Sequence, residues 1–157
     1  MLPMNFADLV DRIRTERHLY HEVPGFDPSN GNEQARYFFL LEAPGSKAVQ
    51  SGLISLDNPD PSARNLRDQL AHAGIEREDI ALWNVVPWYI GNDAGTAIRA
   101  ASGQDVREGL EYLRPLVSAM PNLSCIILVG GAARKRERGQ VLLFALARWF
   151  TIRLTRE

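Results

Sequence analysis

Three short apolar runs, separated by helical patterns, constrain most strongly what this chain can fold into. The runs are Tyr37-Phe-Phe-Leu-Leu41, Ile80-Ala-Leu-Trp83 and Ser124–Val129. Because successive positions in each run are apolar, the runs are typical of strands buried on both faces. Helices between such strands predict βαβ units and a parallel sheet. We therefore expect an α/β fold, a three-layer α/β/α sandwich around a mainly parallel, four-stranded sheet.

The helical patterns and turns complete this expected architecture. Helices are expected after Asn5 and over about 62–73, 104–119 and 132–148. Their predicted buried positions include Phe6, Leu9, Val10 and Ile13 in the first helix and Val106, Leu110, Leu113 and Val117 in the third. Asn5 and Ser62 are the predicted N-caps, and Gly74 is the predicted left-handed end of the second helix. Segment 21–35 is rich in turn formers and predicts a loop, and 149–155 predicts the fourth strand.

Length and composition limit the classes of protein to consider. A chain of 157 residues with a net charge of -1 is expected to form one domain, over 1–157. A single cysteine excludes an intrachain disulfide and four-cysteine iron–sulfur or zinc sites, and Cys125 is expected to be a buried, inert thiol. The histidines show no ligand spacing, so we expect no metal and no cofactor. Without an apolar stretch or a leader pattern, we expect a cytoplasmic monomer that binds no membrane.

Two features near the C-terminus allow more than one interpretation. Basic residues predominate in 130–157, mainly in Arg134-Lys135-Arg136-Glu137-Arg138. Such a cluster can neutralise phosphates, although a solvated helix face explains it as well. Gly130-Gly131 lies between a predicted strand and a predicted helix, where it is suited to hold a phosphate or to form a tight turn.

The ends of the first two predicted strands carry the most suggestive polar groups. Glu42-Ala43-Pro44-Gly45 directly follows the first strand, and Asn84 follows the second. Ligands of parallel sheets bind beyond the carboxyl ends of the strands, where these segments are expected to meet. The amide of Asn84 offers both a donor and an acceptor, a pair suited to the edge of a planar base. A local hydrogen bond to the backbone is the alternative role for Asn84.

The order and spacing of four segments resemble the uracil-DNA glycosylase superfamily, over roughly 36–135. Leu41-Glu-Ala-Pro-Gly45 is similar to the Gly-Glu-x-Pro-Gly turn of the branch that usually carries an iron–sulfur cluster. Leu82-Trp-Asn-Val-Val-Pro-Trp88 resembles the strand whose Asn recognises the uracil edge. Segment 57–66 occupies the place where the family shapes its pocket, and 127–133 resembles a later strand and turn.

The resemblance implies hydrolysis of the N-glycosidic bond of uracil, or of a related deaminated base, extruded from DNA. Asn84 would then bind the O4/N3 edge of the base, and Glu42 would position water or stabilise the sugar cation. The turn residues Ala43, Pro44 and Gly45 would lie against the substrate. Leu53 or Ile54 would contact the base where the family has an aromatic residue. Arg134, Lys135 and Arg136 would contact the DNA backbone.

The sequence also departs from the family pattern. It lacks the iron–sulfur cysteines, and Ala43 stands where the best-known branch has a water-activating Asp. The final motif of the family is His-Pro-Ser-like, and no His-Pro dipeptide occurs here. We therefore expect a domain truncated at its C-terminus, with impaired activity. A catalytically silent relative that binds nucleic acid is one alternative, and a module that binds a nucleotide or phosphate at Gly130-Gly131 is another.

Overall fold

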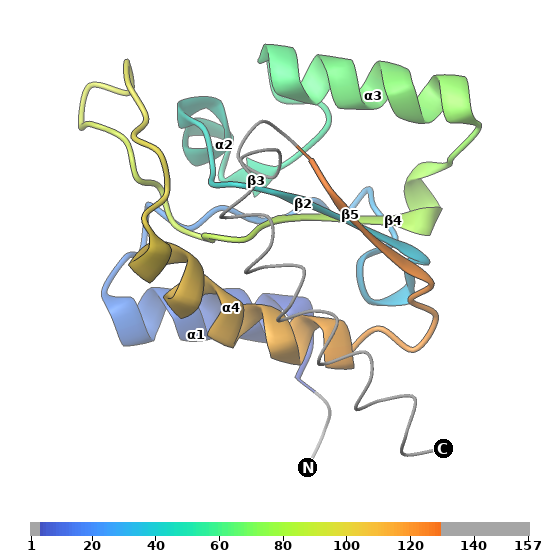
Figure 1. The fold of residues 1–157 in the computed structure, drawn as a ribbon, viewed down its shortest axis with the longest axis horizontal. Helices are drawn as coiled ribbons and strands as arrows, with labels where there is room; N and C mark the ends of the chain where they lie inside the picture. The colour runs from blue at the N-terminus through green and yellow to red at the C-terminus, as the bar shows by residue number, and fades with distance from the viewer. Residues whose placement is uncertain (1–3, 130–157) are drawn as a thin grey trace.

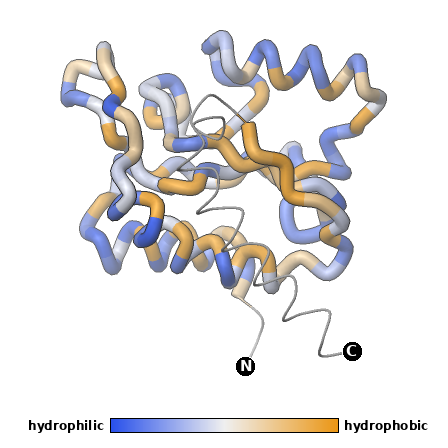
Figure 2. The backbone as a smooth tube through the Cα atoms, viewed as in Figure 1, coloured by the Kyte–Doolittle hydropathy of each residue, from blue (hydrophilic) through white to orange (hydrophobic). Residues whose placement is uncertain are grey.

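The three predicted apolar runs form one parallel sheet. The computed structural model describes residues 4–129, and in it β2 (Tyr37–Leu41) lies between β4 (Ile80–Asn84) and β5 (Cys125–Leu128). Every residue of β4 is buried, as are the three central residues of β2. Figure 2 shows hydrophobic residues concentrated along these central strands. This burial agrees with strands covered on both faces.

Helices pack on both faces of this sheet. In Figure 1, α1 (Phe6–Arg17) and α4 (Gly103–Ser118) lie side by side on one face, and α3 (Pro61–Ala73) lies on the other with the short α2 (Ser46–Ser51). The predicted α/β class with parallel strands is confirmed. The four-stranded central sheet is not confirmed, because the described residues form separate sheets of three and two strands. The predicted fourth strand, 149–155, lies outside the described residues.

The second sheet joins two segments that carry no strand pattern in the sequence. β1 (Gly25–Phe26) pairs in parallel with β3 (Leu53–Ile54). The ring of Phe26 stacks on Trp83 with centroids 4.0 Å apart and contacts Phe6 at 4.4 Å. The prediction of a loop over 21–35 was therefore incomplete, because aromatic packing fixes β1 against the core. Two short 3₁₀ helices, η1 (Asn32–Gln34) and η2 (Arg77–Asp79), complete this region.

Local capping explains where the long helices begin and end. Asn5 caps α1 as predicted, since its side chain accepts a hydrogen bond from the Asp8 N–H at 2.8 Å. The N-cap of α3 is Asp60 and not Ser62, because Pro61 occupies the first helical position, which needs no N–H. Gly74 ends α3 at a φ of 67° as predicted.

The buried faces agree with the predicted helical stripes, completely in α1 and partly in α4. Phe6, Leu9, Val10 and Ile13 are all buried in α1. In α4, Leu113 and Val117 are buried as predicted, whereas Val106 and Leu110 are only partly buried. No helix among residues 4–129 has the length and apolar character that crossing a membrane requires.

Two predictions at the C-terminal end of the described chain have different outcomes. The prediction that Cys125 is a buried thiol was wrong, because it is exposed at the first position of β5, which lies at the edge of the described three-stranded sheet. The predicted turn at Gly130-Gly131 and the predicted helix over 132–148 fall outside the described residues. Their structure is therefore still a prediction.

Close packing of α4 against the end of β4 makes Gly109 a sensitive position. A Cβ at Gly109 would overlap the carbonyl oxygen of Val85, one residue beyond β4. Gly109→Ala should therefore lower the free energy of unfolding by about 1–3 kcal/mol, although alanine normally favours a helix. Urea unfolding followed by circular dichroism measures the effect. Gly103→Ala is the control, since its Cβ meets only the flexible end of Arg107 at 3.4 Å. Equal stability of both variants would contradict this close contact.

Candidate base-binding site

The pairing of β2 with β4 brings the two predicted strand-end segments together. Leu41 lies opposite Asn84 in the parallel register. The Val85 N–H donates to the carbonyl oxygen of Leu41 at 2.8 Å, and the Val86 N–H donates to that of Glu42 at 2.9 Å. These bonds extend the ladder beyond the strands and hold the turn after β2 beside Asn84.

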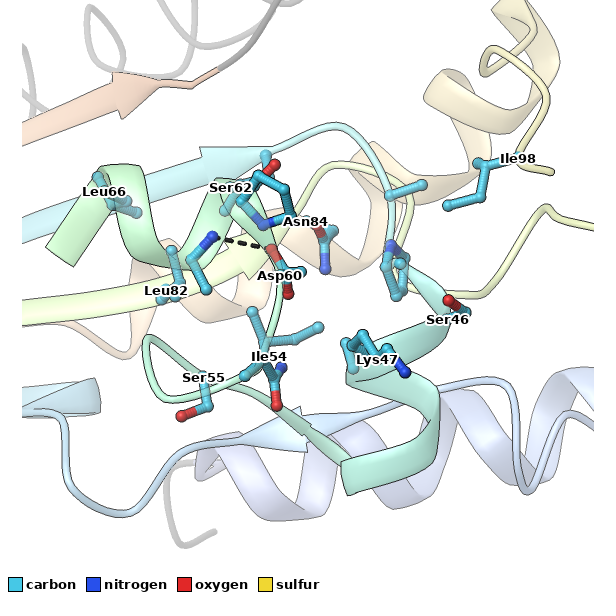
Figure 3. A pocket seen from close by; sticks show the side chains of 18 residues that line it. Ser46, Lys47, Ile54, Ser55, Asp60, Ser62, Leu66, Leu82, Asn84 and Ile98 are labelled. Atoms are coloured by element: carbon cyan, nitrogen blue, oxygen red, sulfur yellow. Dashed lines mark hydrogen bonds between the residues drawn. The ribbon is translucent and has the colours of Figure 1, made fainter. Parts of the chain in front are cut away.

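A cavity of about 340 Å³ opens at this edge of the sheet. Its volume lies within the range of small-molecule sites, and its walls are mostly apolar. Figure 3 shows side chains from the turn after β2, from α2, from β3 and from the start of α3 converging on it. The sequence-predicted residues that line it are Ala43, Pro44, Gly45, Ile54 and Asn84.

Asn84 is the polar group that distinguishes this cavity. Its side chain is 2% exposed, and its Nδ2 has no hydrogen-bond partner within the described chain. A buried donor without a partner costs about 1–3 kcal/mol. The alternative role predicted for Asn84, a local hydrogen bond to the backbone, therefore leaves this donor unexplained. The arrangement suits a ligand that presents an acceptor to Nδ2 inside the pocket.

The turn at Pro44-Gly45 leaves free space beside the backbone. Gly45 precedes α2 with a φ of -81°, which any residue adopts, so its backbone conformation does not require glycine. No atom lies within 4 Å of the position that a Cβ would take at Gly45. The main chain at Gly45 therefore faces the cavity without a side chain to cover it, and a ligand can approach the backbone closely there.

The two aliphatic residues predicted to contact a base have different positions. Ile54 is buried and lines the cavity, whereas Leu53 does not line it. The carbonyl oxygen of Leu53 accepts hydrogen bonds from Asn58 Nδ2 at 2.9 Å and from Ser51 Oγ at 3.2 Å. Leu53 thus joins the loop after β3 to the end of α2, and Ile54 supplies the apolar surface.

Glu42 lies next to this cavity and does not line it. Its Oε1 accepts the Ala101 N–H at 2.8 Å, which ties the end of β2 to the residue before the N-cap of α4. Glu42 lines a neighbouring cavity of about 680 Å³ between the sheet and α3. The two cavities share Leu41, Ala43, Ser62 and Leu66. Among residues 4–129, no His, Cys, Asp and Glu side chains are grouped so as to hold a metal ion.

Asp60 lies in segment 57–66, which was expected to shape the pocket, although it was not singled out as a site residue. Its carboxylate lines the cavity and caps α3, with Oδ1 accepting the Ala63 N–H at 2.9 Å (Figure 3). The Asp-Pro pair at the start of a helical pattern was the available signal, because Pro at the first helical position favours an Asp before it. Asn58, from the same expected segment, also lines the cavity, as do Ser46, Lys47, Ser55 and Ile98, which were not predicted.

An ionic network around the buried carboxylate of Asp27 lies next to the cavity. Asp27 is 4% exposed and accepts hydrogen bonds from Ser55, which lines the cavity, and from Arg77 at 2.8 Å. Burial alone would raise the pKa of Asp27, but hydrogen bonds from Ser55 and Ser29 and the charge of Arg77 outweigh it. Its pKa therefore lies below its ordinary value. Arg77 also binds Asp57 at 2.8 Å, so one guanidinium joins the segment that follows β1 to the segment that follows β3.

Comparison with known proteins identifies the family of this fold. A family model described as Uracil DNA glycosylase superfamily matches residues 28–153. The chain belongs to the uracil-DNA glycosylase superfamily. The match contains β2, β4 and all residues that line the cavity, and membership indicates a DNA glycosylase-type function with DNA as the substrate. No curated protein matches the chain significantly. Arg134, Lys135 and Arg136 lie outside the described residues, so their predicted contact with DNA stays a prediction.

The network below the cavity predicts a pH-dependent stability. Asp27→Asn should lower the free energy of unfolding at pH 7 by about 1–3 kcal/mol, because hydrogen bonds to a buried charge are lost. Since the folded-state pKa is lowered, the carboxylate stabilises the fold above the unfolded value of about 4, and this contribution disappears as pH falls further. Urea titrations should show the difference from wild type shrinking toward pH 3.

The matched control uses the exposed partner of the same arginine. Asp57 is 59% exposed, so Asp57→Asn should cost less than about 1 kcal/mol at any pH. Equal losses in Asp27→Asn and Asp57→Asn would contradict the role of the buried carboxylate.

Proposed function

We propose that this protein removes uracil, or a related deaminated base, from DNA by hydrolysing the N-glycosidic bond. The observation that carries the proposal is the buried Asn84 amide, whose Nδ2 lacks a partner inside a pocket at the strand ends. A base inside a duplex is inaccessible to such a pocket, so the nucleotide has to rotate out of the stack.

The chemistry of Asn84 favours uracil over cytosine. Its Nδ2 donates to O4 of uracil, and its Oδ1 accepts from N3–H. Cytosine presents a donor and an acceptor at the same positions in the reverse order, so both groups would be mismatched. Because the amide is buried, a mismatched base leaves polar groups unpaired, and discrimination of this kind is strong. The apolar surface of Ile54 supports the ring, and the Pro44-Gly45 turn leaves room for the sugar and phosphate.

Two carboxylates are candidates for positioning water or stabilising the sugar cation. Glu42 is the candidate from the sequence, and one of its oxygens is bound to the Ala101 N–H. Asp60 lines the same pocket as Asn84. This geometry favours Asp60 for contact with the substrate and Glu42 for holding the loop that precedes α4. Arg134, Lys135 and Arg136 are proposed to neutralise phosphates on either side of the extruded nucleotide.

The central test is uracil release from a labelled oligonucleotide, scored as abasic sites. Asn84→Ala should lower the single-turnover rate by about 10³ or more, because the amide that reads the base edge is lost. Asn122→Ala is the control, since this exposed asparagine lies before β5, at the opposite edge of the sheet. Salt-sensitive retention of DNA without base release would instead indicate the catalytically silent relative.

A second experiment tests which of the two carboxylates, Asp60 or Glu42, acts on the substrate. Asp60→Asn should lower the single-turnover rate by about 10² or more, while the helix cap persists because asparagine also caps helices well. Glu42→Gln retains an oxygen for the Ala101 N–H and should cost less. Thermal unfolding of both variants separates lost chemistry from lost stability. A larger rate loss in Glu42→Gln would assign the reacting carboxylate to Glu42.

A further inference from the structure

A second cavity lies beside the Asn84 pocket, and the proposed reaction does not use it. Its volume is about 680 Å³, compared with about 340 Å³ for the Asn84 pocket. The residues that line both cavities are Leu41, Ala43, Ser62 and Leu66. Figure 3 shows two of them, Ser62 and Leu66, on α3 at the side of the Asn84 pocket opposite Lys47. A ligand that fills the first pocket can therefore extend directly into the second.

The floor of the second cavity is apolar and comes from two paired strands. Phe39 of β2 lies opposite Ile127 of β5 in the parallel register. Alternate residues of a strand face the same side, so Leu41 and Val129 continue this surface toward the strand ends. Phe39 is buried, whereas Ile127 and Val129 are only partly buried. The partly buried residues leave apolar surface on which a flat ring can lie.

One face of α3 adds a polar wall to this floor. Ser62, Asn65 and Gln69 line the cavity, and all three are exposed at the helix surface. Their spacing of three and four residues places them on the same side of the helix. Asn65 and Gln69 each carry an amide with both a donor and an acceptor. The wall can therefore read the edge of a ring that rests on the apolar floor.

The charge of the second cavity favours a base over a phosphate. Glu42 is the charged residue among those that line it, and its Oε1 accepts the Ala101 N–H at 2.8 Å. A carboxylate repels phosphate and accepts hydrogen bonds from amino groups. Asn and Gln bind N6 and N7 of adenine as a pair, and Glu accepts from an exocyclic amino group. Adenine therefore matches this set of donors and acceptors best.

We propose that the second cavity binds the base next to the extruded uracil on the same strand, with a preference for adenine. This inference rests on the proposed function, since a uracil beside Asn84 brings its neighbour to the shared wall. In single-stranded DNA the neighbouring base is not held by pairing, so it is free to enter the cavity. The ligand is then two consecutive nucleotides of DNA, one read by Asn84 and the other by the amides of α3.

The test measures kcat/KM for uracil release from single-stranded oligonucleotides that differ only in the base before or after the uracil. Single strands are used because in a duplex the neighbouring pair also changes the cost of extruding the uracil. Adenine on one of the two sides should raise kcat/KM about fivefold or more over thymine, which lacks the amino group and N7. Asn65→Ala and Gln69→Ala should each remove most of this preference and leave kcat/KM for the thymine neighbour unchanged.

Gln104→Ala is the matched control. It removes an exposed amide from α4, on the other face of the sheet, where Gln104 Nε2 donates to Glu108 at 2.8 Å. This variant should keep the wild-type preference. Circular dichroism checks that all three alanine variants fold, as expected for alanine in exposed helical positions. Equal kcat/KM for all neighbours, or a preference that persists in both α3 variants, would overturn the second subsite while leaving the proposed function intact.

Absence of uracil release by the wild-type protein would contradict the proposed function separately. Binding then decides the second subsite, measured by fluorescence anisotropy with the same labelled oligonucleotides. Uracil next to adenine should bind about fivefold more tightly than uracil next to thymine, and Asn65→Ala should abolish the difference. Equal binding of the two oligonucleotides to the wild-type protein would overturn the inference.

Discussion

The parallel register of β2 and β4 is the constraint on which the proposed site depends. With Leu41 opposite Asn84, the ladder bonds from Val85 and Val86 place the turn at Glu42 against the last residue of β4. A shift of this register by one residue would direct the Asn84 side chain to the opposite face of the sheet. The position of the amide in the pocket therefore follows from strand pairing, before any contact with a ligand.

The buried amide of Asn84 keeps its position without a hydrogen-bond partner for Nδ2, because packing contacts on both sides of Asn84 fix the end of β4. Next to Asn84 in β4, Trp83 is 1% exposed and stacks on Phe26, which anchors β4 to the second sheet. Beyond it, Val85 lies directly against α4 at Gly109. Packed interiors resist small displacements, so Asn84 cannot turn easily toward an alternative partner. An isolated polar group of this kind is typical of a binding site whose donor is satisfied by ligand.

The elements that could be predicted from the sequence are those whose signal is local. Apolar runs identify β2, β4 and β5, and helical spacing identifies the buried face of α1. Asn84 could be predicted as a site residue because it directly follows an apolar run. β1 and β3 were missed because two-residue strands have no periodicity and depend on pairing between distant segments. The N-cap of α3 was predicted at Ser62 and is Asp60, because the sequence pattern does not fix the exact first residue of a helix. Cys125 was wrongly predicted to be buried, because a short apolar run does not show whether its strand lies at the centre or at the edge of a sheet. Ile98 had no signal at all, since its significance arises only from its place beside the pocket.

Glu42 connects the pocket to the hairpin that Gly91 and Ile98 close with an antiparallel bridge, from which Ile98 lines the pocket. Its backbone belongs to the turn that borders the pocket, and its carboxylate binds the N–H of Ala101, directly before the capping box of α4. Asp105 of that capping box binds Arg99, the neighbour of Ile98. A short series of polar contacts thus runs from the end of β2 to the exposed aliphatic residue. Because this series exists before any ligand binds, the separation between Asn84 and Ile98 is set by the protein, and little conformational freedom has to be lost when both meet a partner. A ligand that lies beside Asn84 therefore meets a pocket rim of fixed shape at Ile98, which an unanchored surface loop would not provide.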